Sequence, residues 1–117
     1  MSTDDREYMR NYKTASPELL KAYAGFTNAV FAEDGLEIPK KYRELMAVSV
    51  AISSQCQYCI DAHTKSAARA GASEAEIAEA IWVAAALGAG AAWTHGRLAF
   101  KAVAPHEPAT PQPGHEH

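Results

Sequence analysis

The stretch "SSQCQYCIDAH", residues 53–63, holds both cysteines of the chain and one of its five histidines. Ser54 with Gln57 three residues later is a capping-box pattern, which predicts that one helix ends before Ser54 and another begins at Gln55. This turn decides the fold, because it places the C-x-x-C pair at the N-terminus of a central helix. It also folds the preceding helix back against that central helix.

The residues before this turn predict two helices. Ser16 followed by Pro17 places an N-cap before a proline at the first helical position, and the helix that follows is expected to stop near Gly35. Pro39 suits the start of the next helix, which carries apolar residues on almost every face up to Ile52. A helix of that composition is expected to be central and buried.

The residues after the turn predict further helices. The central helix is expected to end where Gly71 supplies a left-handed C′ position, and Ser73 with Glu76 forms a second capping box that starts the next helix. Glycine costs about 1 kcal/mol relative to alanine inside a helix. The run "AAALGAGAAW", residues 84–93, therefore predicts a kink or break, followed by a last helix to about Val103.

Helical periodicity along the chain, with abundant alanine and no convincing strand, predicts an all-α fold. A chain of 117 residues suffices for one domain. We expect a single-domain bundle of about five to six helices over residues 16–103. Residues 1–15 are polar and expected to be irregular or loosely helical. Residues 104–117 hold four prolines and nothing to bury, so they are expected to form a disordered tail.

The composition excludes several classes of function. A net charge of −3 and a pI near 5.9 leave no basic stripe to attract nucleic acid or an anionic membrane. The N-terminal stretch, residues 1–13, lacks the apolar core of a signal peptide, and no apolar run approaches the roughly 20 residues that span a bilayer. We therefore expect a soluble cytoplasmic protein, in which a C-x-x-C pair is a redox or metal pair rather than a structural staple.

The cysteine face has the geometry of a reversible disulfide. A helix advances about 100° per residue, so Cys56 and Cys59 lie roughly 60° apart and His63 returns to within about 20° of Cys56. Cα atoms three residues apart are about 5 Å from each other, which a disulfide tolerates. Helix-terminal amides favour thiolate with a net gain of only about threefold, whereas a positioned proton acceptor contributes about 10²–10⁴-fold. His63 is the candidate for that acceptor.

Glu44 is a second candidate for moving protons. It is the one acidic residue in the apolar stretch "YRELMAVSVAI", residues 42–52, so burial is expected to raise the pKa of its carboxyl group toward that of a general base. On one straight helix Glu44 and Cys56 diverge by about 120°. Only a turn at residues 53–54 brings Glu44 to His63.

Other interpretations of these residues stay open. The cysteines suit a packing role, and Glu44 suits a surface ion pair with Lys40 or Lys41 at helical spacing. Tyr58 points away from the cysteine face by spacing alone and suits a core position equally well. A structural zinc site would use Cys56, Cys59, His63 and, as fourth ligand, His95 or Glu44.

The combined spacing of these residues matches a known pattern. Glu44, eleven intervening residues, "CQYCIDAH" at residues 56–63 and "ASEAEIAEA" after Gly71 resemble the core motif of the alkylhydroperoxidase D-like proteins, within the carboxymuconolactone decarboxylase family. The resemblance covers roughly residues 16–103. It implies an all-helical subunit that assembles into trimers or hexamers, with an active site near a subunit interface.

The resemblance implies a thiol-dependent peroxidase or disulfide oxidoreductase that reduces hydroperoxides without a bound cofactor or metal. Cys59 would attack the peroxide to give a sulfenic acid, Cys56 would resolve it as a disulfide, and Glu44 with His63 would move protons. Re-reduction would come from a dithiol partner, such as a lipoyl domain or a thioredoxin-like protein. The helix-start argument instead favours attack by Cys56, so the choice of attacking cysteine stays open.

Tyr58 marks a departure from that family pattern. Well-studied peroxidase members carry a histidine at this position, and a phenol with a pKa of about 10 donates a hydrogen bond but does not exchange protons near pH 7. Other family members act as decarboxylases on lactones, which here would use Glu44 and His63 alone. The intact cysteine pair favours the peroxidase. A metal-binding or scaffolding oligomer whose cysteines hold zinc is a further alternative. The small residues at positions 84–93 permit close helix approach, which supports association of the chain with copies of itself.

Overall fold

The computed structural model describes residues 3–105, and all regular secondary structure in that range is helical. This confirms the all-α prediction. The five helices are α1 (Thr3–Ala15), α2 (Pro17–Val30), α3 (Lys40–Ser53), α4 (Gln57–Arg69) and α5 (Glu74–Val103).

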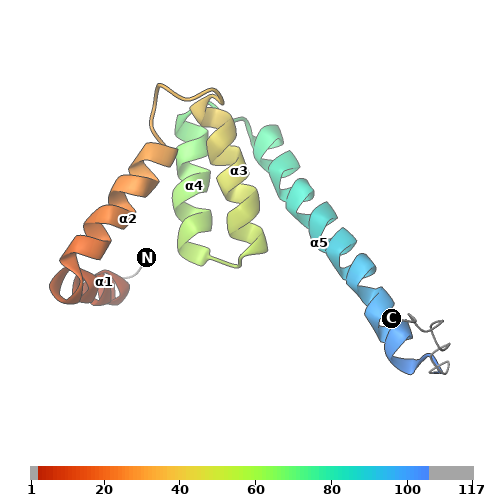
Figure 1. Cartoon of the computed structure of the whole chain (residues 1–117). Coiled ribbons are helices and arrows are strands. Elements are labelled where there is room, and N and C mark those ends of the chain that lie inside the picture. Colours follow the sequence, from red (N-terminus) through yellow and green to blue (C-terminus); the bar gives the residue numbers. More distant parts are fainter. Residues whose placement is uncertain (1–2, 106–117) are drawn as a thin grey trace, which may run out of the picture.

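Three of the helices pack together, and α3 lies at their centre. Helices α3 and α4 run side by side in opposite directions, and α5 packs against α3 with its first turns before it extends away (Figure 1). Helices α1 and α2 pack on each other and form an arm on the opposite side of α3, at a distance from the backbones of α3, α4 and α5. The chain is therefore elongated, with extents of 64 × 41 × 34 Å.

The buried core of the described chain is small and centres on α3. Its apolar members are Val48, Ala51, Ala67 and Ala84. The prediction that α3 is central is confirmed, but only one of its faces is buried, since Tyr42, Met46 and Val50 are exposed.

The turn between α3 and α4 is a Schellman motif centred on a glutamine. The Cys56 N–H donates to the Ala51 carbonyl at 3.0 Å, and the Gln55 N–H donates to the Ile52 carbonyl at 3.1 Å. Gln55 takes the left-handed position, with φ of +56°. The predicted capping box at Ser54 is wrong, because Ser54 is the C-cap of α3 and α4 begins only after Cys56.

The junction between α4 and α5 agrees with the predictions from local sequence. Gly71 is left-handed, with φ of +97°, and its N–H donates to the Ala68 carbonyl. At the start of α5, the Ser73 hydroxyl accepts the Glu76 N–H and the Glu76 carboxylate accepts the Ser73 N–H, so both bonds of the predicted capping box are present. A short, well-defined turn thus returns the chain to α3.

Helix α5 is unbroken over 30 residues, so the predicted kink or break at Gly88 and Gly90 is wrong. The surrounding alanines are the best helix formers and outweigh two glycine penalties. Added methyl groups at Gly88 and Gly90 would meet no atom of the described part of the chain. By length and composition α5 is also apolar enough to cross a membrane, with a mean hydropathy of 1.4 over an 18-residue window, which corrects the expectation that no apolar run has that length.

The N-terminal part of the chain is more regular than predicted. Residues 3–15 form α1, and α2 begins at Pro17 as predicted, but the Ser16 side chain makes no capping hydrogen bond. Helix α2 ends at Val30, before the predicted stop near Gly35. The predicted disordered tail falls mostly in residues 106–117, which lie outside the described residues.

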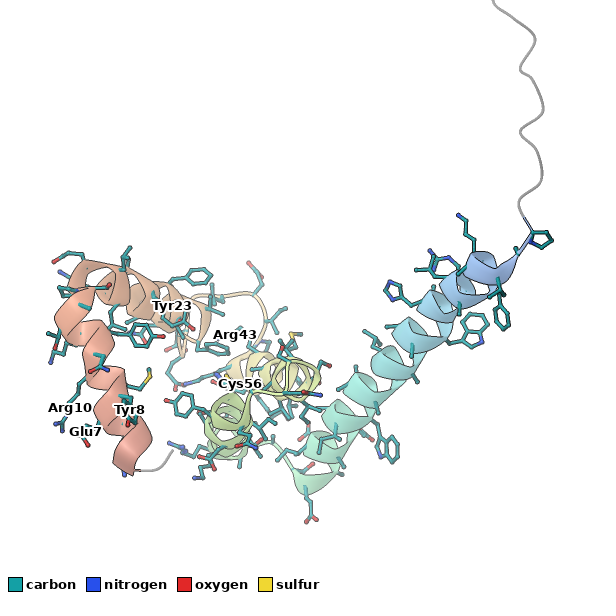
Figure 2. All side chains as sticks on the ribbon, turned by 90° about the horizontal axis from the view of Figure 1, so that it is seen from below. Glu7, Tyr8, Arg10, Tyr23, Arg43 and Cys56 are labelled. Atoms are coloured by element: carbon teal, nitrogen blue, oxygen red, sulfur yellow. A yellow bond between two sulfur atoms is a disulfide. The ribbon has the colours of Figure 1, made fainter. Side chains whose placement is uncertain are left out.

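Large apolar side chains are exposed on both extensions of the molecule. On α2, the side chains of Leu19, Tyr23 and Phe26 are about two-thirds exposed or more. On α5, Trp82, Trp93 and Phe100 are more than 70% exposed, and the side chains along its far half meet no other helix of residues 3–105 (Figure 2). Exposed apolar surface of this kind is typical of interaction sites.

Candidate active site

A cavity of about 370 Å³ lies between the end of α2, the central part of α3 and the start of α4. Both cysteines and His63 line it, and most of the remaining wall is apolar. The lining residues are Val30, Phe31, Arg43, Met46, Ala47, Val50, Ala51, Ser54, Cys56, Cys59 and His63.

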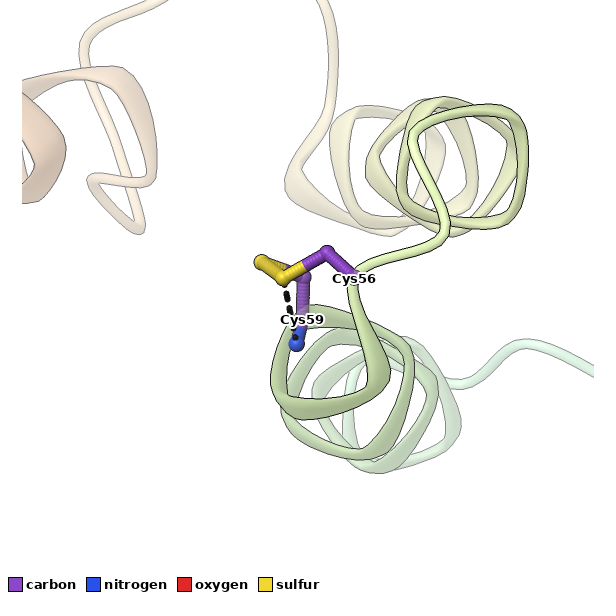
Figure 3. Close-up of a disulfide and its surroundings, with 2 residues drawn as sticks. All are labelled: Cys56 and Cys59. Carbon is purple, nitrogen blue, oxygen red and sulfur yellow. Dashed lines mark hydrogen bonds between the residues drawn. A yellow bond between two sulfur atoms is a disulfide. The ribbon is translucent and has the colours of Figure 1, made fainter. Parts of the chain in front are cut away.

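The two cysteines form a disulfide at the N-terminus of α4, with Cα atoms 5.2 Å apart (Figure 3). Cys56 is the N-cap residue, and its sulfur accepts the Cys59 N–H at 3.3 Å. The prediction placed Cys56 two residues deeper, at the second helical position, and this register is wrong. An N-cap sulfur receives a backbone amide directly, which stabilises negative charge on it in the reduced protein.

Glu44 and His63 meet across the α3–α4 pair. The Glu44 side chain is 3% exposed, and its Oε2 lies 2.7 Å from Nδ1 of His63, which is 24% exposed. A proton on Nδ1 donates to the carboxylate, which leaves Nε2 of His63 to exchange protons. A buried carboxylate requires such a partner, because an unpaired buried charge is strongly destabilising.

The structure rejects the alternative surface role for Glu44. Lys40 pairs with Glu33 at 2.7 Å, and Lys41 pairs with Glu76 at 3.0 Å. Neither lysine takes the Glu44 carboxylate, which instead faces α4.

Two further residues contact the site and were not predicted from the sequence. The Phe31 ring lies against the His63 ring, with centroids 4.6 Å apart. Arg43, next to Glu44 on α3, lines the cavity and donates hydrogen bonds to the backbone carbonyls of Val30, Ala32 and Ile38. The sequence holds one signal that could have identified Arg43, which is the one basic residue in the apolar stretch of residues 42–52.

Tyr58 and His95 lie away from this cavity. Tyr58 is 55% exposed and is not among the lining residues. His95 lies on α5 beside a separate hollow formed by residues of the same helix. Within residues 3–105, no group of three or more His, Cys, Asp and Glu side chains is placed to hold a metal ion. The residues of the alternative zinc site do not form such a group among the described residues, and Cys56 and Cys59 are joined as a disulfide.

A protein-family model matches most of the chain. The profile of the "Carboxymuconolactone decarboxylase family" matches residues 17–102, which include all four residues of the cysteine and Glu–His pairs. A Paracoccus denitrificans protein named "Uncharacterized protein 4 in cox locus" is 45% identical over 79 residues, covering 68% of this chain and 69% of the relative. A Haemophilus influenzae protein named "Uncharacterized protein" is 41% identical over 72 residues, covering 57% and 64% of the two chains.

Solved structures share the fold. A crystal structure of a Methanobacterium thermoautotrophicum protein is similar with a TM-score of 0.68 and 28% identity, covering 76% of this chain and 98% of the other. The crystal structure of an apo carboxymuconolactone decarboxylase family protein from Legionella pneumophila is similar with a TM-score of 0.64 and 24% identity, covering 85% and 87% of the two chains. The second likeness supports the fold alone.

Proposed function

Because this chain belongs to the carboxymuconolactone decarboxylase family, we propose that it is a thiol-dependent peroxidase of the alkylhydroperoxidase D-like kind. One observation carries the proposal: a single cavity is lined by the Cys56–Cys59 disulfide and by His63, whose Nδ1 is held by the buried Glu44. A redox pair and a proton relay in one cavity are the two parts that hydroperoxide reduction requires.

In the proposed first step, His63 takes the proton of the Cys59 thiol. The Cys59 thiolate attacks the outer oxygen of the hydroperoxide, so that an S–O bond forms and the O–O bond breaks. The leaving alkoxide takes the proton back from His63 and departs as the alcohol, and Cys59 becomes a sulfenic acid. The buried Glu44 carboxylate stabilises the imidazolium between these two transfers.

In the second step, the Cys56 thiolate attacks the Cys59 sulfur. The disulfide forms, and the sulfenic oxygen leaves as hydroxide and takes up the proton lost by Cys56 to give water. The N-cap position suits Cys56 to this role, since its sulfur accepts the Cys59 N–H. The net reaction converts one hydroperoxide and the dithiol into one alcohol, one water and the disulfide.

The wall of the cavity favours a hydroperoxide with an apolar body. Val30, Met46, Ala47 and Val50 line the cavity beside the cysteines. Hydrocarbon contacts with these residues add binding free energy that hydrogen peroxide cannot gain. We therefore propose organic hydroperoxides as the preferred substrates.

The cycle needs an external dithiol to reduce the Cys56–Cys59 disulfide. In two thiol–disulfide exchanges, Cys56 and Cys59 return to thiols and the external dithiol becomes a disulfide. A lipoyl domain or a thioredoxin-like protein has that chemistry, and a compartment that keeps such dithiols reduced is the cytoplasm. The exposed apolar surfaces of α2 and α5 support assembly into a trimer or hexamer. Light scattering on the purified protein tests this assembly, and a stable monomer would contradict it.

Steady-state turnover tests the proposed function. With cumene hydroperoxide and dihydrolipoamide, the wild-type protein should consume peroxide, whereas Cys59→Ser should not. A wild-type rate no higher than that of Cys59→Ser would contradict the proposal. A lactone decarboxylase that uses Glu44 and His63 alone would instead retain its activity on a lactone substrate in the Cys59→Ser variant.

A further inference from the structure

The guanidinium group of Arg43 donates hydrogen bonds to three backbone carbonyls, one at the end of α2 and two in the segment that joins α2 to α3. Its Nη1 donates to the Val30 carbonyl at 2.7 Å, its Nη2 to the Ala32 carbonyl at 2.6 Å and its Nε to the Ile38 carbonyl at 2.8 Å. The Val30 carbonyl belongs to the last residue of α2, where helix carbonyls lack intrahelical partners. Arg43 thus holds both ends of the segment at residues 31–39.

Phe31 lies between two of the carbonyls that Arg43 binds. Its neighbours in sequence, Val30 and Ala32, are both tied to the guanidinium, so the Phe31 backbone is fixed on either side. Its ring lies against the His63 imidazole, with centroids 4.6 Å apart and planes inclined at 37°. Helix α2 otherwise lies away from the backbones of α3 and α4, so this contact depends on the loop path that Arg43 sets.

Two neighbouring residues of α3, Arg43 and Glu44, therefore restrain the His63 imidazole at two places. Glu44 holds the ring edge directly through Nδ1. Arg43 acts on the ring face, through the loop and Phe31. A single hydrogen bond to Nδ1 leaves the ring free to swing about that bond, and a side chain packed on the face removes this freedom.

We propose that Arg43 and Phe31 are positioning residues for His63, which keep its Nε2 directed at the cysteine cavity. The expected effect on peroxide turnover rests on the proposed function, whereas the expected effect on the position of the His63 ring does not. The role requires arginine, because the planar guanidinium presents donors in several fixed directions, whereas a lysine ammonium is a compact point charge on a flexible stem. It also requires a flat ring at position 31.

A nuclear magnetic resonance experiment on the full chain tests the structural part without any peroxide. Protons that lie over the face of an aromatic ring resonate upfield, so the His63 ring protons should move downfield in Phe31→Leu and stay near their wild-type positions in Phe31→Tyr. Arg43→Lys should move them downfield as well, although Arg43 acts only through Phe31. Phe26→Leu on α2 and Arg69→Lys on α4 are the matched controls and should leave the His63 signals in place. His63→Gln assigns the signals.

The catalytic part is tested with cumene hydroperoxide. Phe31→Leu and Arg43→Lys should each lower turnover about tenfold, which is within the range for a displaced catalytic group. The double variant should be no slower than Phe31→Leu alone, because Arg43 acts through that ring. Additive losses would overturn the shared role.

The outcomes separate this inference from the proposed function. His63 signals that stay in place in Phe31→Leu would overturn the ring contact, and signals that move in Phe31→Leu but not in Arg43→Lys would overturn the role of Arg43. If Arg43→Lys does not fold, Phe31→Leu against Phe31→Tyr still decides the ring contact. If the signals move as expected while the wild-type protein turns over no peroxide, the positioning of His63 stands and the proposed peroxidase function fails.

Discussion

Glu44 and His63 are 19 residues apart in the sequence, but Oε2 of Glu44 lies 2.7 Å from Nδ1 of His63. The two residues lie on α3 and α4, which are joined by a turn of three residues. The carboxylate is buried and the imidazole is partly exposed to the cysteine cavity. Glu44 is thus placed to orient His63 and to stabilise its charge, and His63 is placed to meet the substrate.

Replacing Glu44 by glutamine should slow peroxide turnover. The amide keeps a hydrogen bond to Nδ1 but supplies no negative charge for the imidazolium, so we expect a loss of about 10²-fold and an altered pH profile of kcat. The control is Glu33→Gln, which removes an exposed carboxylate paired with Lys40 and should leave both unchanged. A Glu44→Gln enzyme with a wild-type rate and pH profile would contradict the relay.

The two cysteines should give different products when each is left alone. In Cys56→Ser, Cys59 has no resolving partner, so one hydroperoxide should leave it as a sulfenic acid that dimedone traps and mass spectrometry detects. In Cys59→Ser, Cys56 should react no faster than a free thiol. Rapid sulfenic acid formation at Cys56 instead would reverse the two roles.

Gln55→Gly should stabilise the protein. Gln55 adopts φ of +56°, where a residue with a Cβ is strained by about 1–2 kcal/mol. Glycine removes this strain, but it loses more backbone conformational entropy on folding, which offsets part of the gain. We expect a net gain of about 0.5–1 kcal/mol in the free energy of unfolding, measured with urea. Gln57→Gly, in the first turn of α4, should lower it by up to about 1 kcal/mol. A Gln55→Gly protein no more stable than wild type would contradict the assigned strain.

Glu76 should make stability depend on acid pH. Its carboxylate accepts the Ser73 N–H and pairs with Lys41, and these contacts lower the pKa of Glu76 below its ordinary range in the folded chain. Because the pKa is lower in the folded than in the unfolded state, the stabilisation is complete above the unfolded value and is lost as pH falls through the folded value. Urea unfolding against pH should show this loss in wild type and not in Glu76→Gln. Parallel curves would contradict it.

The sequence predicted those parts of the fold that depend on local backbone chemistry. Gly71 provides the left-handed residue that a helix end requires, and Ser73 with Glu76 satisfies the free amides of α5. The existence of a turn before the cysteines was predicted correctly, but the residue at which α4 begins was not. Its left-handed residue is Gln55, which carries no glycine-like signal, so the helix start was placed two residues too early.

The candidate site could be predicted where a charged residue occurs in an otherwise apolar stretch of sequence. Glu44 was a lone acid in an apolar stretch, and its burial against His63 follows from that. The contact of Phe31 with His63 was not predictable, because it depends on the path of residues 31–39 around the Arg43 guanidinium. The unbroken length of α5 differs from the prediction because the alanines around Gly88 and Gly90 favour the helix more than the two glycines disfavour it.

A thiol count on the reduced protein, before and after one equivalent of cumene hydroperoxide, tests most directly whether this cavity reduces hydroperoxides. Two thiols per chain should be lost rapidly, they should return with dithiothreitol, and their loss should be slower with hydrogen peroxide. The same count on urea-unfolded protein gives the rate of ordinary thiols. Thiols that survive the peroxide, or that react no faster in the folded than in the unfolded chain, would contradict the claim that this cavity reduces hydroperoxides.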